Sequence, residues 1–184
     1  MKLSKSALAA LAFVLPIAFV AAQEQGPPMP KPGPEHEVLK MDIGTWDATV
    51  EMIPGPGAPP MTSKGVEVNT LGCGGLCIIT DFKGELMPGV TFHGHGTMTW
   101  DAARKKYVGS WTDSMSAGLS LTEGTWDPKT KKFTGSMEGP DMTGKVVKTR
   151  SVVDYSGGGR VMTAFAPGPD GKEMQVLKIT YKKK

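Results

Sequence analysis

The chain lacks the features that identify several large classes of protein. Its longest apolar run, Ala7 to Val20, contains Pro16 and is 14 residues long, whereas a membrane-spanning helix needs about 20. Its charges nearly balance, with 21 Lys and Arg against 18 Asp and Glu, which argues against nucleic-acid binding because phosphate recognition needs a concentrated basic face. No catalytic motif stands out, so the sequence favours a protein that is not an enzyme and gives no reason to expect a cofactor.

Cysteine is scarce too, and the two that occur, Cys73 and Cys77, flank Gly74-Gly75. A zinc site would need two further ligands nearby, and a redox motif normally has two intervening residues instead of three. On a straight strand the two Cα atoms would lie about 13 Å apart. A Gly-Gly reversal brings them within the roughly 4.4–6.8 Å that a disulfide tolerates, so we predict a Cys73–Cys77 bridge.

The N-terminus has the pattern of a secretory signal peptide. Met1 to Lys5 is basic, the apolar run follows, and Ala21-Ala22 precedes polar Gln23. We expect cleavage after Ala22 and export to the periplasm or the medium, where a disulfide persists; an uncleaved anchor is the alternative. Loss of Lys2 and Lys5 lowers the net charge from +3 to +1. We expect no membrane span in the mature protein, whose oligomeric state the sequence leaves open.

The most informative pattern is a block that occurs twice. Trp100-Asp101, Lys105-Lys106-Tyr107 and Gly109-Ser110 return as Trp126-Asp127, Lys131-Lys132-Phe133 and Gly135-Ser136. Each copy predicts a β-hairpin, in which a turn opened by Asp joins two strands whose aromatic residues face each other. Successive hairpins form a meander, and a meander that fills most of the chain most economically closes into a barrel without open edges.

The remaining chain supports a single barrel domain, 35–184, after a proline-rich linker, 23–34. A short helix is predicted from Glu35 to Ile43. Ten strands follow, the first beginning near Thr45 with a buried phase at Trp46, Ala48 and Val50. The other nine are predicted near 63–71, 76–85, 90–100, 107–114, 119–126, 132–138, 146–155, 160–166 and 173–182. The predicted fold is thus an all-β, antiparallel up-and-down barrel.

Antiparallel pairing of Trp100 with Tyr107 assigns the two faces of the first hairpin. Gly96 then faces Trp111 and Gly94 faces Asp113, on the side that we predict to be the interior. His93 and His95 lie on the other side, which we expect to face solvent. Their spacing suits a metal, but no third ligand accompanies them, so they are weak metal candidates. Near Leu119 and Leu121 the alternation of inward and outward side chains is ambiguous, because a bulge there would exchange the inner and outer faces of the strand.

Several blocks together resemble the bacterial family called protein of unknown function 1579. They are Glu35-His36, Gly44-Thr45-Trp46, Pro54 to Ala58, Asp81 to Glu85, Trp100 to Ser116, Glu138 to Asp141 with Thr143 to Lys145, and Gly168 to Glu173. This resemblance covers nearly all of the chain after the signal peptide. It implies a lipocalin-like barrel of the calycin group and brings no established activity with it.

Gly44-Thr45-Trp46 is also similar to the Gly-x-Trp at the first strand of lipocalins. The similarity implies that Trp46 closes the base of the barrel beneath a basic side chain of the last strand, for which Lys178 and Lys182 are the candidates. The cysteine pair and His93-Gly94-His95 depart from the family pattern.

We therefore expect a barrel that binds a small apolar or amphipathic molecule in its interior. The candidate contacts are Phe92, Met98, Trp100, Trp111 and Met137, with Asp113 as the polar anchor. Glycines on the inner face either make room for this ligand or let aromatic rings lie flat on the backbone. Two alternatives stay open: a structural or protein-interaction barrel with a filled core, and a metal- or haem-linked enzyme that uses His93 and His95.

Overall fold

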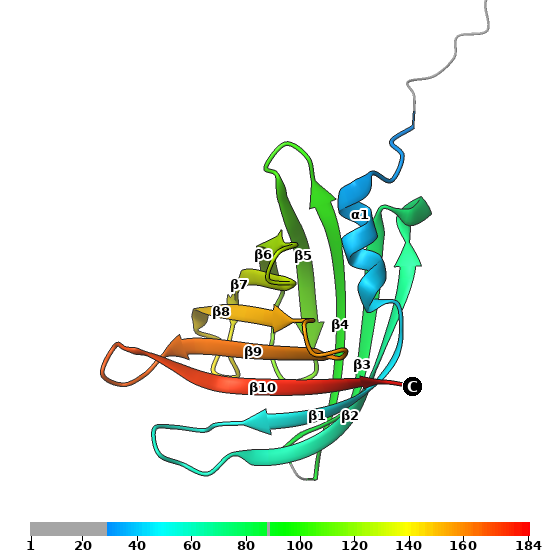
Figure 1. Ribbon diagram of the computed structural model, residues 1–184. Helices are drawn as coiled ribbons and strands as arrows, with labels where there is room; N and C mark the ends of the chain where they lie inside the picture. The colour runs from blue at the N-terminus through cyan, green and yellow to red at the C-terminus, as the bar shows by residue number, and fades with distance from the viewer. Residues whose placement is uncertain (1–28, 88) are drawn as a thin grey trace, which may run out of the picture. The chain divides into compact units, whose positions relative to one another are not determined.

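The computed structural model describes residues 29–87 and 89–184 and consists of a closed antiparallel barrel with one short helix (Figure 1). The predicted signal peptide, 1–22, and the first half of the predicted linker lie outside the described residues. No helix in the described ranges is long and apolar enough to cross a bilayer.

Ten strands form the barrel, and each pairs with its neighbours in sequence. Strand β1 also pairs with β10, which closes the sheet and confirms the predicted up-and-down topology. The strands are β1 (Gly44–Met52), β2 (Met61–Gly72), β3 (Cys77–Met87), β4 (Val90–Asp101), β5 (Lys106–Asp113), β6 (Ser120–Asp127), β7 (Lys132–Pro140), β8 (Val146–Asp154), β9 (Arg160–Pro167) and β10 (Glu173–Lys183).

The two repeated hairpins have the predicted register. Trp100 pairs with Tyr107, their rings 4.9 Å apart in a T-shaped arrangement, and Trp126 pairs with Phe133. Gly94 faces Asp113 on the inner side. Asp101 and Asp127 accept backbone N–H bonds within their turns, which explains why both hairpins reverse after Asp.

The ambiguity at the start of β6 is resolved without exchange of the faces. Ser120 lies opposite Trp111 and is buried, so Leu119 and Leu121 point outward and are 54% and 61% exposed. The connection between β5 and β6 absorbs the change of phase, because residues 114–119 are not part of either strand.

Helix α1 (Pro34–Leu39) covers one end of the barrel, beside β3 and β4 (Figure 1). A 3₁₀ turn, Lys40–Asp42, continues it within the predicted helical segment. Leu39 is buried in one cluster with Ile78, Tyr107 and Phe133. The Tyr107 hydroxyl donates to the carbonyl of Glu35 at 2.9 Å, and burial raises the pKa of Tyr107 to about 12.

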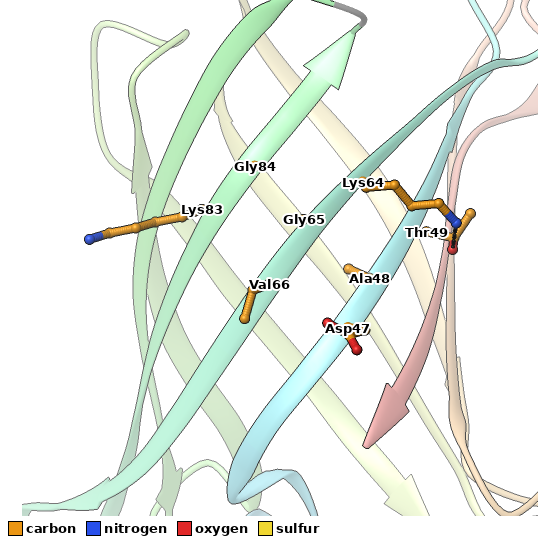
Figure 2. Close-up of a pocket in the computed structure, with 8 residues that line it drawn as sticks. All are labelled: Asp47, Ala48, Thr49, Lys64, Gly65, Val66, Lys83 and Gly84. Atoms are coloured by element: carbon orange, nitrogen blue, oxygen red, sulfur yellow. Dashed lines mark hydrogen bonds between the residues drawn. The ribbon is translucent and has the colours of Figure 1, made fainter. Parts of the chain in front are cut away.

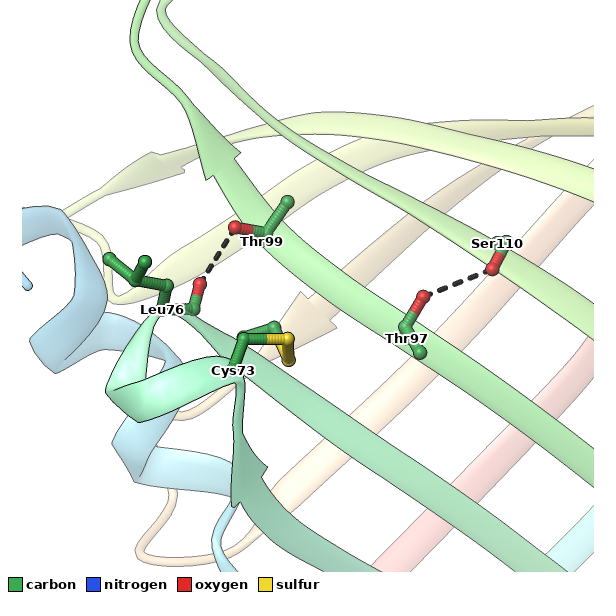
Figure 3. Close-up of a disulfide and its surroundings, with 6 residues drawn as sticks. Cys73, Leu76, Thr97, Thr99 and Ser110 are labelled. Atoms are coloured by element: carbon green, nitrogen blue, oxygen red, sulfur yellow. Dashed lines mark hydrogen bonds between the residues drawn. A yellow bond between two sulfur atoms is a disulfide. The ribbon is translucent and has the colours of Figure 1, made fainter. Parts of the chain in front are cut away.

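A disulfide joins Cys73 to Cys77 at the same end, as predicted, with Cα atoms 5.4 Å apart. Gly74 and Gly75 have positive φ angles of 65° and 95°, which supply the reversal that the bridge requires. Figure 3 shows Thr99 of β4 donating a 2.7 Å hydrogen bond to the carbonyl of Leu76, so the bridged turn is also tied to the neighbouring strand.

Candidate functional site in the barrel interior

One wall of the interior, from β2 to β5, is formed by aromatic rings that lie on glycines. A Cβ atom added to Gly94 would come within 2.1 Å of the Trp111 ring, and one added to Gly65 within 2.3 Å of the Phe82 ring. Phe82 also contacts Phe92 edge to face, with centroids 5.7 Å apart. These glycines therefore accommodate rings, which was one of the two interpretations left open by the sequence. We call Phe82, Phe92 and Trp111 the aromatic wall.

The interior surface of β6 to β9 is formed largely of small side chains. Thr122 pairs with Met137, which pairs with Thr149, and Gly135, Ser151 and Ala164 form the adjacent cross-strand row. These are the inward residues, because Phe133, which precedes them in the same phase of β7, is buried. We call Thr122, Gly135, Thr149, Ser151 and Ala164 the small-residue wall.

The two walls face each other. In a ten-strand ring each strand lies across from the fifth strand along, so β4 is opposite β9 and β3 is opposite β8. Trp111, Met137, Thr149 and Ser151 point inward yet are only half-buried. Because the strands around them are hydrogen-bonded into a closed wall, the exposed part of these side chains faces the lumen.

The six predicted contact residues all lie on the inner phase, but they do not form one group. Phe92 and Trp111 belong to the apolar cluster that surrounds Val50 and Ile179, whereas Met98 and Trp100 pack in the cluster beneath α1. Met137 is half-buried on β7, among the small residues.

The sixth residue, Asp113, is half-buried, and its carboxylate already has protein partners. Oδ2 accepts a 3.0 Å hydrogen bond from Trp111 Nε1. Oδ1 accepts 2.8 Å bonds from the backbone N–H groups of Met115 and Ser116. The carboxylate thus holds the β5–β6 loop and orients the Trp111 ring.

A buried polar cluster lies at the end of the barrel that carries α1. The Arg160 guanidinium on β9 donates to Asp42 at 2.9 Å and also to Glu67. Tyr155 donates its hydroxyl to Asp42 at 3.0 Å. Asn69 bonds to Glu67 at 2.7 Å and accepts from Thr80, extending the cluster to β3. We call this group the polar base; it ties the segment after α1 to β2 and β9.

The polar base holds two carboxylates and one guanidinium. Burial alone would lower the pKa of Arg160, but Asp42 and Glu67 raise it above its ordinary value, so the side chain stays charged. Burial raises the pKa of Asp42; Arg160 opposes this effect and Glu67 adds to it. Burial, together with the negative charge of Glu67, outweighs the opposing effect of the guanidinium, so Asp42 holds a proton more tightly than usual.

Trp46 is buried at the base of the barrel under cationic side chains, but they are not the predicted ones. The Arg160 guanidinium lies 4.9 Å and the Lys183 ammonium 5.3 Å from the ring centroid of Trp46. Lys178 and Lys182 were wrong candidates, because they fall on the outward phase of β10. A residue from the penultimate strand, β9, supplies the closer cation.

His93 and His95 are exposed on the outer face of β4, as predicted. His95 Nδ1 lies 2.8 Å from Asp81 on β3, while Lys83 is the cross-strand neighbour of His93. No group of three or more His, Cys, Asp or Glu side chains suited to a metal occurs among the residues that the structure describes.

A shallow hollow of about 580 Å³ also lies on the outside, across β1, β2 and β3 (Figure 2). Apart from the buried Ala48, the residues that line it are exposed or half-buried, among them Lys64, which donates to the Thr49 hydroxyl at 2.7 Å. Surface side chains of this kind do not form a preorganised binding site.

The sequence did not predict the polar base, because Glu67 and Asp42 lie 93 and 118 residues from Arg160 along the chain. One signal was available. Ser63, Glu67 and Asn69 occupy the inward phase of β2, where alternation predicts apolar residues.

Comparison with known proteins gives a family match. The model of the family described as "Protein of unknown function (DUF1579)" matches residues 31–183, which include the helix and all ten strands. No curated protein matches the chain.

Proposed function

Because the chain belongs to this family of unknown function, DUF1579, we propose from the geometry of the interior that it is a lipocalin-like barrel which binds a small apolar or amphipathic molecule. The observation that carries the proposal is the pair of facing walls. By the order of the strands, Phe92 on β4 lies across the ring from Ala164 on β9, and Phe82 on β3 lies across from Ser151 on β8. The inward side chains of Trp111, Met137 and Thr149 are half-buried.

The number of strands supports an interior with room for a ligand. Barrel diameter grows with strand number, and about eight strands already give an interior that side chains just fill or that holds one small ligand. Ten strands form a wider ring than eight, and the small side chains of the small-residue wall take up less of its interior than aromatic rings would. Met137 on β7 and Met162 on β9 point inward, and their flexible, polarizable thioethers adapt to irregular apolar shapes.

The base of the barrel supports the lipocalin-like assignment. Trp46 lies near the start of β1, two residues after Gly44, and its Nε1 donates to the carbonyl of Asp42 at 2.8 Å. Arg160 lies over its ring. A buried Trp beneath a cation closes one end, so that a ligand enters from the opposite end.

The rival proposal, a structural barrel with a filled core, has one observation in its favour. Aromatic rings cover Gly94, Gly96 and Gly124, and they fill space that the glycines leave. If the remaining lumen is also too small for a ligand, the barrel acts through its surface. An apolar dye distinguishes the two possibilities.

We would titrate the mature protein with N-phenyl-1-naphthylamine, an uncharged dye that fluoresces in apolar sites. We expect saturable binding to the wild type. Ala164→Trp fills the lumen and should weaken binding at least ~10-fold, as loss of an apolar site does. Thr163→Trp adds the same ring to the outer face of β9 and should leave binding unchanged. Equal binding by both variants would refute a lumen site.

We also propose that residues 1–22 direct export and are removed. N-terminal sequencing of the protein from its own host should then begin at Gln23; a start at Met1 would refute removal.

A further inference from the structure

The charged side chains on the inner phase of the described strands are few. They are Glu67 on β2, Asp113 on β5 and Arg160 on β9, together with Lys183, which lies exposed where β10 ends. Asp42 joins them from the segment after α1. Whether a ligand with a charged group is accepted depends on whether any of these charges is available to the lumen.

Two of the three nitrogen atoms of the buried cation, Nη1 and Nη2 of Arg160, donate to carboxylates. Arg160 lies between the carboxylates of Asp42 and Glu67 and packs on the Tyr181 ring, 3.8 Å from its centroid. Its Nε atom has no hydrogen-bond partner, but that atom is enclosed and without accessible surface. A carboxylate in the lumen would have to displace an acidic side chain to reach this guanidinium.

The anions are equally engaged. Asp113 accepts three hydrogen bonds from Trp111 and the β5–β6 loop. Glu67 accepts from Asn69 as well as from Arg160. A cationic ligand would therefore compete with bonds that hold the loop and the base of the barrel together. A charged group that enters the lumen without a partner loses its hydration, and no new interaction offsets that cost.

The entrance is also neutral. At the end away from α1, the β1–β2 loop, 53–60, and the β5–β6 loop, 114–119, contain no charged residue. The β7–β8 turn has one Asp and one Lys, and so does the β9–β10 turn. The described part of this rim has no excess of either sign to attract a charged ligand.

Uncharged polar groups remain on the small-residue wall. The hydroxyl groups of Thr122 on β6 and of Thr149 and Ser151 on β8 lie on the inward phase. The Thr149 hydroxyl donates a long, 3.4 Å hydrogen bond to the carbonyl of Met137 and keeps its capacity to accept. A hydroxyl donates and accepts, so these side chains suit the hydroxyl, ether or carbonyl oxygen of a ligand.

From these observations we infer that the lumen selects uncharged amphipathic molecules, with an apolar body and hydroxyl, ether or carbonyl groups, and rejects anions and cations built on the same body. The inference rests on the proposed binding function and adds the chemical class of the ligand.

Two dyes with the same aromatic body test the inference. N-Phenyl-1-naphthylamine is uncharged, and 8-anilino-1-naphthalenesulfonate is the same body with a sulfonate. We expect the wild type to bind the sulfonate at least ~10-fold more weakly. Thr149→Lys adds a cation without a carboxylate partner to the small-residue wall and should shift the ratio toward the sulfonate by ~10-fold or more. Thr163→Lys adds the same charge to the outer face and should leave the ratio unchanged. Denaturant melts establish that both variants are folded.

The outcomes separate the two proposals. If the wild type binds the sulfonate as tightly as the neutral dye, at a site that Ala164→Trp fills, the lumen binds ligands but does not select neutral ones, and the inference is wrong. An unchanged ratio in Thr149→Lys would also overturn it. If neither dye binds, the proposed function fails and the inference fails with it.

Discussion

Replacement of Gly94 by Ala tests whether aromatic rings lie directly on the barrel wall. The backbone of Gly94 has no positive φ, so alanine is compatible with its conformation. The new Cβ would be 2.1 Å from Trp111 Cζ2, whereas carbon atoms prefer separations of about 3.5–4.0 Å. The ring must therefore move.

The movement has two costs. Overpacking a core typically costs about 1–3 kcal/mol. The hydrogen bond from Trp111 Nε1 to Asp113, 3.0 Å long, has a charged acceptor, and its loss costs about 1.5–3 kcal/mol. Alanine also restricts the unfolded chain, which stabilises the folded protein by about 0.4–1 kcal/mol and offsets part of these costs. We expect a net loss of about 2–5 kcal/mol in the free energy of unfolding.

Urea denaturation followed by tryptophan fluorescence measures this loss. Gly157→Ala is the matched control, because nothing lies within 4 Å of its Cβ position and its φ is not positive. It should change the stability by no more than about 1 kcal/mol, in the stabilising direction. Ordinary surface substitutions change the free energy of unfolding by no more than about 0.5 kcal/mol. If the stability of Gly94→Ala lies within that range of the wild type, Trp111 does not rest on the backbone and the glycine leaves open space.

Three further predictions concern other parts of the barrel. Trp126→Ala should cost about 3–5 kcal/mol in urea melts, and His95→Ala, on the outer face, no more than about 0.5 kcal/mol; the reverse ranking would mean that the faces are exchanged. The raised pKa of Asp42 favours folding below its unfolded value, and this contribution is lost as pH rises through the folded value. Wild type should therefore lose stability relative to Asp42→Asn between pH 4 and pH 7, and a gain would contradict the raised pKa. Thiol titration of the unfolded, unreduced protein should find Cys73 and Cys77 blocked; reduction should cost no more than about 2–3 kcal/mol, and two reactive thiols would exclude the bridge.

The strand pairing could be predicted because it depends on local patterns. The spacing of Trp100 and Tyr107 around an Asp-initiated turn is enough to set the register of a hairpin, and alternation then assigns every inward residue of both strands. The number of strands followed from turn residues, and closure from the cost of leaving edges unpaired.

The polar base could not be predicted in the same way. Asp42, Glu67 and Arg160 come from three distant segments that meet only when β1 pairs with β10. The role of Asp113 also escaped prediction, since its partners are backbone N–H groups whose positions depend on the conformation of the β5–β6 loop. The sequence shows which residues face inward but not which of their polar groups are already satisfied.

Native mass spectrometry of the protein purified from its own host decides whether the lumen binds a ligand. Wild type should carry a bound, uncharged small molecule that denaturation releases, and Ala164→Trp purified in parallel should have the mass of the polypeptide alone. If wild type and variant both have the mass of the bare polypeptide, or if both carry the same molecule, the lumen is not the binding site and the filled barrel is the better account.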